Sequence, residues 1–450
     1  VHIEAKKTMH QRTKSSELFS RGRKAIPDGV SSPMRAFALV GGNPICAASA
    51  KGTKVTDADG NVYTDFLNAF GALILGHARD EVVDAVCNQV ANGSVYGLST
   101  ELEYQLAEKI VASTPAIDQV RFVCSGTEAV MTAARIARAH TGRKLLLKFS
   151  GAYHGHSDVL LASPANIGQG KGTKGGTQGI SDHLNREIVL CEYNDMVELE
   201  RLFSVHGHDI AAVLVEPVAT NMGLVKPLPG FHQLIRDLCD KHGSLFIFDE
   251  VVTAFRAQFG GVCTSMGIDP DLVTFGKIIG GGTPVGAYGG KARFMQHVAI
   301  GGSVFQSGTF AANPLTMAAG NAALDVLAQP GFYDQVEERG AWLEAVLTEQ
   351  FIDKDIPFHV SRYGALVGVA YRSTQTPMQS YKDVKTQQYE VFKQVHANLI
   401  ERGYLTAPSL EEPFFVSAAH SHEDITGFAE ALAESIQMYL PEAMKSPVAA

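Results

Sequence analysis

The chain has 450 residues and a formal net charge of −9, from 38 lysines and arginines against 47 aspartates and glutamates. A chain of this length buries a large core and exceeds one small domain. A hydrophobic content of 45%, a charged content of 19% and 44 glycines fit a folded α/β enzyme and exclude a disordered or fibrous chain. The negative charge and the lack of a basic stripe argue against nucleic acid as a main partner.

Signals for a membrane or an oxidising compartment are lacking in the sequence. Residues 1–7 lead into polar sequence without the apolar core of a signal peptide, and no run of about 18 apolar residues exists to span a membrane. The cysteines have no Cys-x-x-Cys spacing, which favours reduced thiols over a zinc site. They are Cys46, Cys87, Cys124, Cys191, Cys239 and Cys263. We therefore predict a cytoplasmic protein.

The first hundred residues carry separate helix and hairpin signals. Residues 9–25 are compatible with a helix, and residues 55–66 alternate around Asp59-Gly60, which is typical of a hairpin. Thr100, followed three residues later by Glu103, predicts a capping box at the start of another helix.

From about residue 119 onward, short apolar runs alternate with helical stretches. The runs are Gln119–Cys124, Leu145–Phe149, Ile188–Cys191, Ile210–Glu216, Leu245–Glu250, Leu272–Phe275 and Ala287–Gly289, and the helical stretches include 127–140, 229–242 and 313–327. Continuous apolar strands between helices predict a mostly parallel sheet covered on both faces. Such sheets bind ligands at the carboxyl ends of their strands. After Pro330 the pattern predicts a separate, smaller α/β unit, in which residues 374–383 form a polar loop.

Lys277 and Asp249 stand at the ends of two of these apolar runs. Lys277 follows Leu272–Gly276 and precedes three glycines, and Asp249 ends the run that begins at Leu245. A lysine at the mouth of a buried strand can form a Schiff base with an aldehyde, and a buried carboxylate can pair with a pyridinium nitrogen. Alternatively, Lys277 is a surface lysine and Asp249 caps the next helix. Taken together, the two residues favour a pyridoxal phosphate site.

A phosphate group needs a cradle, and Ser125-Gly126-Thr127 lies between a predicted strand and a helix. Glycine lets the backbone approach closely, and the first amides of a helix point at a bound anion. Tyr153 follows another strand end, where its ring is suited to stacking on a pyridine ring. The His154-Gly155-His156 spacing suits a metal ion, but no third ligand is evident nearby, so we predict no metal site.

Several motifs together resemble those of a known enzyme family. They are Ser125-Gly126-Thr127-Glu128-Ala129, Tyr153-His154-Gly155-His156, Glu216-Pro217-Val218, Phe248-Asp249-Glu250-Val251 and Gly276-Lys277-Ile278-Ile279-Gly280-Gly281-Gly282. This set resembles the class III aminotransferases of fold type I. Ser31–Phe37, Pro284–Gly290 and Phe415–His420 further resemble the glutamate-1-semialdehyde 2,1-aminomutase branch. The resemblance covers nearly the whole chain.

The resemblance implies a fold and a domain organisation. The fold is α/β, with a mostly parallel seven-stranded sheet in a large domain and a smaller α/β domain built from both chain ends. Residues 1–69 would form an N-terminal segment that joins the small domain, residues 70–330 the large cofactor-binding domain, and residues 331–450 the C-terminal small domain. The active unit would be a homodimer with active sites at the subunit interface.

The resemblance also assigns the cofactor and the residues that hold it. Pyridoxal 5'-phosphate would be the cofactor and pyridoxamine 5'-phosphate its intermediate form. Lys277 would bind the aldehyde and shuttle a proton, and Asp249 would keep the ring nitrogen protonated. Val251 and Tyr153 would cover the two ring faces, and Asn221 would lie near the phenolic oxygen. Ser125, Gly126 and Thr127 would hold the phosphate, together with Thr309 of the neighbouring subunit.

Substrate residues follow from the same resemblance. Ser32 and Arg35 would bind the substrate carboxylate, since arginine offers a bidentate fork; an ordinary surface ion pair is the alternative for Arg35. Glu412 matches a glutamate near the substrate amino group, although a shift of one residue would assign this position to Glu411 instead.

The departures from the aminomutase pattern concern the substrate pocket. Phe70 replaces a tryptophan, Ser150 a glutamate and Ala152 a cysteine, and residues 163–172 differ from the pattern of the gating loop. This loop is still rich in glycine and compatible with a lid.

Three functions are compatible with these features. The first is an intermolecular aminotransferase, which moves an amino group between a small carboxylate-bearing amino compound and a keto acid or aldehyde. The second is the aminomutase, which keeps one substrate in place and makes 5-aminolevulinate for tetrapyrrole synthesis. The third is a non-catalytic cofactor-binding module, against which the presence of Lys277 and Asp249 argues. The substitutions in the predicted substrate pocket lead us to favour the first function, the intermolecular aminotransferase.

Overall fold

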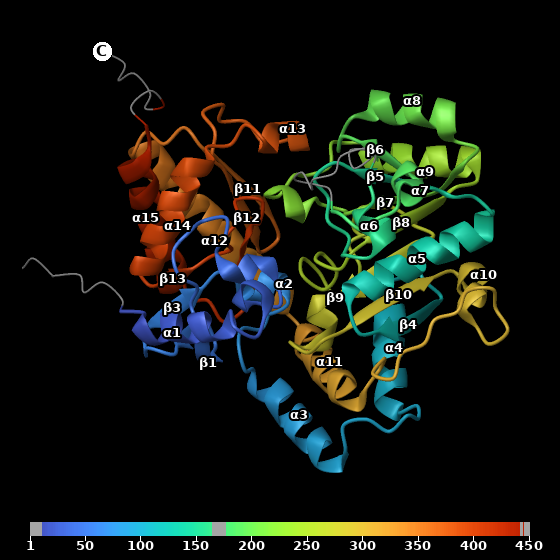
Figure 1. Ribbon diagram of the computed structural model, residues 1–450, viewed down its shortest axis with the longest axis horizontal. Helices are drawn as coiled ribbons and strands as arrows, with labels where there is room; N and C mark the ends of the chain where they lie inside the picture. The colour runs from blue at the N-terminus through green and yellow to red at the C-terminus, as the bar shows by residue number, and fades with distance from the viewer. Residues whose placement is uncertain (1–10, 164–176, 442–443, 445–450) are drawn as a thin grey trace, which may run out of the picture.

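A computed structural model gives the structure of the chain and describes residues 11–163, 177–441 and 444. The expectations for residues 1–7 and for most of the loop at 163–172 lie outside the described residues. In Figure 1 the middle of the chain, from cyan to yellow, builds one region around a large sheet. The blue N-terminal and red C-terminal segments build the other region together.

The large sheet has seven strands in the order β4-β10-β9-β8-β7-β5-β6. Its strands are β4 (Gln119–Val123), β5 (Leu145–Phe149), β6 (Ile188–Cys191), β7 (Ile210–Val215), β8 (Leu245–Asp249), β9 (Leu272–Gly276) and β10 (Gly286–Gly290). Every one coincides with a predicted apolar run. Strands β5 to β9 pair in parallel, and β10 runs antiparallel to both β4 and β9. The predicted mostly parallel sheet is therefore confirmed.

Helices pack on this sheet and on the smaller region. The helices are α1 (Thr13–Gly22), α2 (Asn68–Gly71), α3 (Asp80–Asn92), α4 (Glu101–Ser113), α5 (Gly126–Thr141), α6 (Asp158–Leu161), α7 (Asp182–Arg186), α8 (Met196–His206), α9 (Phe231–His242), α10 (Ala292–Met295), α11 (Pro314–Leu327), α12 (Phe332–Asp353), α13 (Tyr381–Val384), α14 (Tyr389–Glu401) and α15 (His422–Tyr439). Short 3-10 turns are η1 (Pro27–Gly29), η2 (Pro33–Ala36), η4 (Thr220–Met222), η5 (Lys277–Gly280) and η6 (Gln296–Val298). Helix α5 lies across β7 to β10, and α8 packs on β6.

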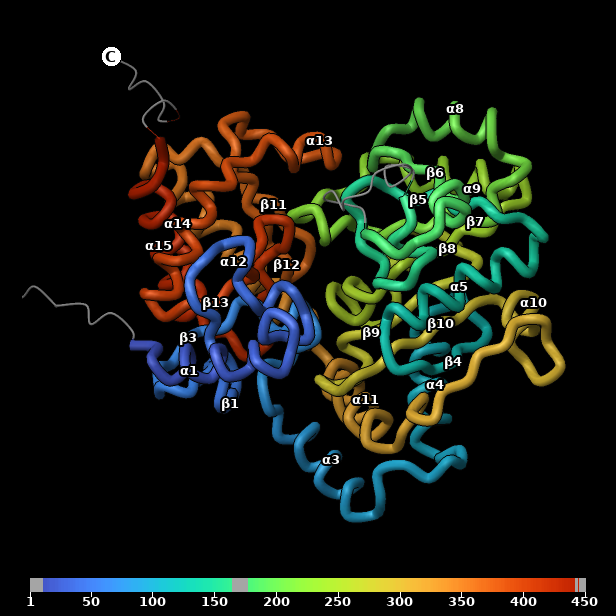
Figure 2. The backbone as a smooth tube through the Cα atoms, viewed as in Figure 1, coloured from blue at the N-terminus to red at the C-terminus, as the bar shows by residue number. Residues whose placement is uncertain are grey.

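The smaller region joins segments from both chain ends. One sheet, in the order β1-β2-β3-β13, pairs three N-terminal strands with a C-terminal one, and the other sheet has the order β11-β12-β14. These strands are β1 (Ala47–Lys51), β2 (Lys54–Asp57), β3 (Val62–Asp65), β11 (His359–Tyr363), β12 (Leu366–Ala370), β13 (Tyr404–Leu405) and β14 (Phe414–Phe415). The predicted hairpin is β2–β3. The backbone tube in Figure 2 shows the blue and red segments side by side. The domain boundaries after residues 69 and 330 stay predictions.

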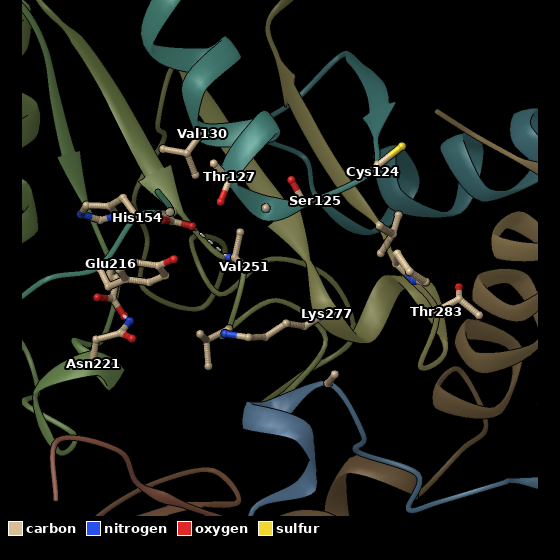
Figure 3. A pocket seen from close by; sticks show the side chains of 18 of the residues that line it. Cys124, Ser125, Thr127, Val130, His154, Glu216, Asn221, Val251, Lys277 and Thr283 are labelled. Carbon is tan, nitrogen blue, oxygen red and sulfur yellow. Dashed lines mark hydrogen bonds and ion pairs between the residues drawn. The ribbon is translucent and has the colours of Figure 1, made fainter. Parts of the chain in front are cut away.

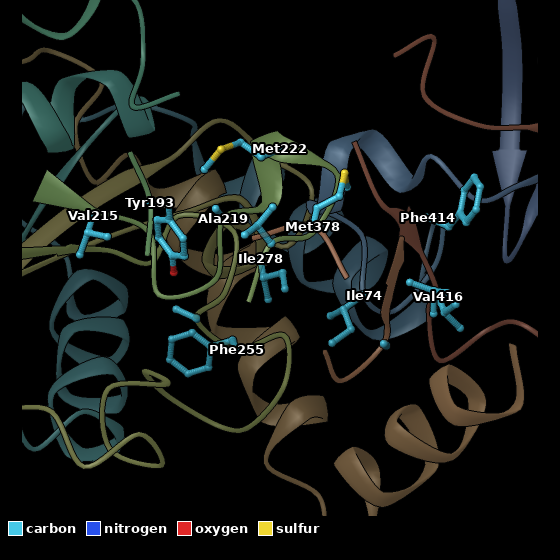
Figure 4. Close-up of a cluster of buried hydrophobic side chains, with 14 of the residues drawn as sticks. Ile74, Tyr193, Val215, Ala219, Met222, Phe255, Ile278, Met378, Phe414 and Val416 are labelled. Carbon is cyan, nitrogen blue, oxygen red and sulfur yellow. The ribbon is translucent and has the colours of Figure 1, made fainter. Parts of the chain in front are cut away.

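One apolar core runs between the two regions. Figure 4 shows Ile74 from the N-terminal part, Val215 from β7, Ile278 from η5, and Phe414 and Val416 from the C-terminal part in one cluster of buried side chains. Burying an apolar side chain of this size contributes about 1.5–3 kcal/mol, so the two regions stabilise each other. Among the residues that the structure describes, no helix has both the length and the apolar character needed to cross a membrane.

The predicted helix starts and ends agree to within a few residues. Thr100 caps α4 by accepting a hydrogen bond from the Glu103 amide at 3.4 Å, which is the first half of the predicted capping box. Helix α1 begins at Thr13, within the predicted span of residues 9–25.

Candidate active site

A cavity of about 470 Å³ opens where strands β8 and β9 of the large sheet end. Its walls contain most of the predicted cofactor residues, which are Ser125, Gly126, Thr127, Tyr153, Asn221, Asp249, Val251 and Lys277. The other lining residues include Ala72, Cys124, His154, Glu216 and Thr283. In Figure 3 the side chain of Lys277 extends across the cavity toward the side that holds Glu216 and Asn221. The volume lies in the range of small-molecule sites.

Lys277 occupies the first position after β9, in a left-handed conformation with φ 49°. Such a conformation costs a non-glycine residue about 1–3 kcal/mol and occurs mostly where the surrounding fold enforces it. Burial lowers the pKa of the Lys277 amino group, and the neighbouring carboxylates, Glu412 foremost, partly offset this by favouring the charged form. A lysine with a lowered pKa is a better nucleophile at neutral pH.

Asp249 ends β8 and is 5% exposed. Its Oδ1 accepts hydrogen bonds from the Thr274 hydroxyl at 2.9 Å and from the Val251 amide at 3.2 Å. Its Oδ2 is hydrogen-bonded to Nδ1 of His154 at 2.7 Å. Three hydrogen bonds therefore fix the orientation of this carboxylate at the wall of the cavity that also contains Lys277.

His154 and Glu216 belong to this site, although the sequence analysis assigned them no role. Both are buried, and Nε2 of His154 and Oε1 of Glu216 have no hydrogen-bond partner among the residues that the structure describes. Oε2 of Glu216 accepts from the Thr220 hydroxyl at 2.7 Å and from the Asn221 side-chain amide at 3.1 Å. Burial raises the pKa of Glu216. The signal available in the sequence was their position at strand ends: Glu216 directly follows β7, and His154 lies in the loop that follows β5.

The two histidines of the His-x-His motif have separate partners. His154 is bonded to Asp249, and Nδ1 of His156 lies 3.2 Å from the Thr127 hydroxyl. Each imidazole thus supports a different part of the site, one the strand-end carboxylate and the other the loop before α5.

Ser125 precedes α5, and Gly126 and Thr127 are the first two residues of this helix. This is the strand–turn–helix arrangement that the sequence predicted for a phosphate site. The Ser125 hydroxyl accepts from the Glu128 amide at 3.2 Å and so caps the helix. A side chain at Gly126 would lie 3.1 and 3.2 Å from the methyl groups of Val251. Glycine is therefore needed for the cradle to approach the cavity wall, and the helix amides attract an anion there.

These features fit pyridoxal phosphate part by part. An amine with a lowered pKa suits the aldehyde, and a buried carboxylate suits the ring nitrogen. The capped start of α5 suits the phosphate, and Tyr153, which is 52% exposed, presents its ring at the cavity. The unpartnered buried atoms of His154 and Glu216 add polar groups that a ligand in the cavity can satisfy.

Glu412 lies close enough to Lys277 for each to shift the pKa of the other. Burial raises the pKa of Glu412 to about 7, and Lys277 acts in the opposite direction. The neighbouring Glu411 instead accepts a hydrogen bond from the Tyr381 hydroxyl at 3.4 Å. Of the two glutamates that the sequence left open, Glu412 is the one beside the lysine.

Besides Glu412, four predicted residues are not among the side chains that line this cavity. Ser32 and Arg35 lie at η2, where Arg35 is exposed. Phe70 is half-buried in the turn labelled α2, next to the lining residue Ala72. Thr309 is exposed in the loop before α11. A single copy of the chain thus does not bring these residues together with Lys277.

The chain matches the family model for class III aminotransferases over residues 38–432. The chain belongs to the class III aminotransferases. It is a pyridoxal phosphate-dependent enzyme that acts on small-molecule amino and keto compounds, as predicted. The predicted family, cofactor and α/β fold are confirmed.

Individual relatives and solved structures of this family help to choose between its possible reactions. The chain is 42% identical to a glutamate-1-semialdehyde 2,1-aminomutase of Desulforapulum autotrophicum, over 94% of this chain and 98% of that protein. An omega-transaminase of Sphaerobacter thermophilus superposes with a TM-score of 0.87 at 35% identity, covering 95% of this chain and 98% of that one. A glutamate-1-semialdehyde aminomutase of Pseudomonas aeruginosa PAO1 superposes with a TM-score of 0.83 at 26% identity, covering 95% of each chain. The relatives favour the aminomutase over the intermolecular reaction to which the pocket substitutions inclined us.

Proposed function

We propose that this class III aminotransferase is a glutamate-1-semialdehyde 2,1-aminomutase, which moves an amino group within one substrate to make 5-aminolevulinate. The observation that carries this proposal is the 42% identity, over nearly the full length of both chains, to an enzyme of that name. The cluster of Lys277, Glu412 and Glu216 beside the cavity supports it. These groups can exchange protons with a substrate that stays in place.

Each residue of the site has a task in this reaction. Bound pyridoxal phosphate supplies an electron-withdrawing ring and an aldehyde carbon that carries the amino group. Asp249, fixed by Thr274 and His154, would pair with the ring nitrogen of the cofactor. Lys277 would hold the cofactor at its aldehyde carbon, and its Nζ atom would take and return the substrate proton. Glu412, with a pKa of about 7, is suited to hold a proton near the substrate amino group.

The remaining cofactor residues orient the ring and the phosphate. Ser125, Gly126 and Thr127 would hold the phosphate at the start of α5, where backbone amides are free to donate. Val251 would pack on one face of the ring and Tyr153 on the other. Asn221 and Glu216, which are joined by a hydrogen bond from the Asn221 side-chain amide, would lie near the phenolic oxygen of the cofactor.

Ser32 and Arg35 are the proposed anchors for the substrate carboxylate, and Phe70 a wall of the substrate site. Arg35 is exposed, so its guanidinium is available for a bidentate contact with a carboxylate. Ser32 and Arg35 come from the N-terminal segment, which packs with the C-terminal region, and Phe70 follows directly after it.

The proposed enzyme is a cytoplasmic homodimer in which Thr309 contacts the phosphate bound by the second subunit. Thr309 lies between Phe305, which is 82% exposed, and Phe310, which is 58% exposed. Large apolar side chains exposed on both sides of one polar residue favour a surface that a second copy covers. The six unpaired cysteines suit a reducing compartment.

An intermolecular omega-transaminase activity is the second candidate. Two observations favour it: the 35% identity with the Sphaerobacter thermophilus enzyme, and the Phe70, Ser150 and Ala152 substitutions in the pocket. A pocket of different shape and polarity admits a different amino donor.

One experiment separates the two candidates. The protein is loaded with pyridoxamine 5'-phosphate and given glutamate-1-semialdehyde alone, and 5-aminolevulinate is followed over many turnovers. Sustained product without any keto acid supports the aminomutase. A single stoichiometric turnover, or none, refutes it; a screen of β- and ω-amino acids and amines with pyruvate or 2-oxoglutarate then tests the transaminase.

A further inference from the structure

The turn labelled α2, Asn68–Gly71, has a backbone conformation that needs support. Asn68, Ala69 and Phe70 have φ of 43°, 50° and 56°, and Gly71 has φ 90°. Consecutive non-glycine residues in the left-handed region are disfavoured and persist where surrounding contacts fix them. The turn leads directly into Ala72, which lines the cofactor cavity.

Arg256 is fully buried beside this turn and has no carboxylate partner among the described residues. Its Nη2 donates to the Gly71 carbonyl at 2.6 Å, and its Nη1 donates to the Val416 carbonyl at 3.4 Å. The guanidinium also lies 5.5 Å from the centre of the Phe415 ring. Burying a charged group without a counterion is costly, so a buried arginine bonded only to carbonyls calls for a specific role.

The contacts of Arg256 join three distant parts of the chain. Arg256 itself lies in the loop between β8 and β9, which also includes the cavity residues Val251 and Val252. The carbonyls that it binds belong to the turn at residue 71 and to the segment after β14. A side chain at Gly71 would lie 2.7 Å from the Phe415 ring, so the turn and β14 are already in close contact.

We propose that Arg256 is a positioning residue that holds the Asn68–Gly71 turn against β14, and thereby sets the Phe70–Ala72 wall of the substrate site. Its two Nη groups donate to carbonyls of two different segments, which a shorter side chain with a single donor group could not do. Arg256 is not among the residues that line the cavity, although its charge is near enough to help lower the pKa of Lys277, so its contact with the wall runs through the turn. The inference rests on this geometry and holds for either candidate reaction.

Hydrogen exchange of the holoenzyme tests this directly and needs no substrate. The amides of Phe70, Ala72 and Leu73 donate within the turn. In R256M we expect them to exchange about ten-fold faster or more, since a hydrogen bond to a charged donor is lost. R256K keeps the charge but not the fork, so we expect an intermediate rate.

Arg143 provides a control at the other end of the strands, where β5, β7 and β8 begin. It donates to the carbonyls of Gly207, Ile210 and His242 and is far from the cavity residues in the fold. R143M loses comparable bonds, but the exchange of residues 70–73 should not change. A69G removes one strained residue and should restore slow exchange in R256M.

The kinetic test asks whether R256M changes KM, kcat or both. We expect R256M to raise the KM of the amino substrate about ten-fold with the affinity for pyridoxal phosphate unchanged, and R143M to leave both unchanged. A folded R256M with wild-type exchange at residues 70–73 overturns the proposal. If R256M does not fold, R256K decides: wild-type exchange in that variant also overturns it.

Discussion

Asp249 offers the sharpest test of the cofactor site, because its charge can be removed with little change in shape. In D249N the amide oxygen can keep the bonds from Thr274 and Val251, at 2.9 and 3.2 Å. The NH₂ group then faces His154 at the former 2.7 Å contact, and the imidazole can accept by moving its proton to Nε2. We therefore expect the free energy of unfolding to fall by no more than about 1 kcal/mol.

The negative charge has no such replacement. Removing one partner of a buried ion pair costs about 3–5 kcal/mol. Since about 1.4 kcal/mol corresponds to ten-fold in rate, the first half-reaction should slow by at least about a hundred-fold. The physical reason is that the cofactor ring attracts electrons from the substrate carbon only while its nitrogen stays protonated.

Stopped-flow absorbance of a single turnover measures this rate, and urea unfolding of the same samples measures stability. T274V is the graded control: it removes one neutral donor but keeps the carboxylate, so about 1 kcal/mol or five-fold is expected. A folded D249N whose half-reaction stays within about three-fold of the wild-type rate would refute the role of the charge.

Three further predictions concern other parts of the site. K277A should stay folded and bind pyridoxal phosphate through the cradle but lose nearly all turnover; if the absorbance of lysine-bound cofactor persists, another lysine is the anchor. Glu412, with its pKa raised to about 7 from 4.5, binds its proton more tightly in the folded state. The wild-type protein should therefore lose stability relative to E412Q as the pH rises from about 4.5 past 7, and urea unfolding at pH 5 and 8 checks this; a difference independent of pH contradicts it. G126A should weaken pyridoxal phosphate binding about ten-fold, because its Cβ would crowd Val251 at 3.1 Å, and V251A should restore part of the affinity, since it relieves the crowding but also shortens a side chain that packs on the ring. Equal affinities in a cofactor titration would show that the cradle tolerates a side chain.

Local patterns were sufficient to predict the large sheet and to select the residues that are proposed to carry the chemistry. All seven strands of that sheet coincide with apolar runs, because a strand buried on both faces needs an unbroken run of apolar residues. Lys277 and Asp249 could be found because each directly follows or ends such a run. The cradle Ser125–Thr127 was equally visible, since a strand, a glycine turn and a helix are contiguous in the chain.

Contacts between distant segments decided the rest, because no local pattern encodes which side chains meet. His154 reaches Asp249 across 95 positions, and Arg256 reaches the turn at Gly71 across 185. The choice between Glu411 and Glu412 depends on which side chain faces Lys277. The pKa values follow from burial, which appears only when the N-terminal and C-terminal segments close over the sheet. The sequence thus identifies the reactive groups, and the packing of the folded chain sets their surroundings.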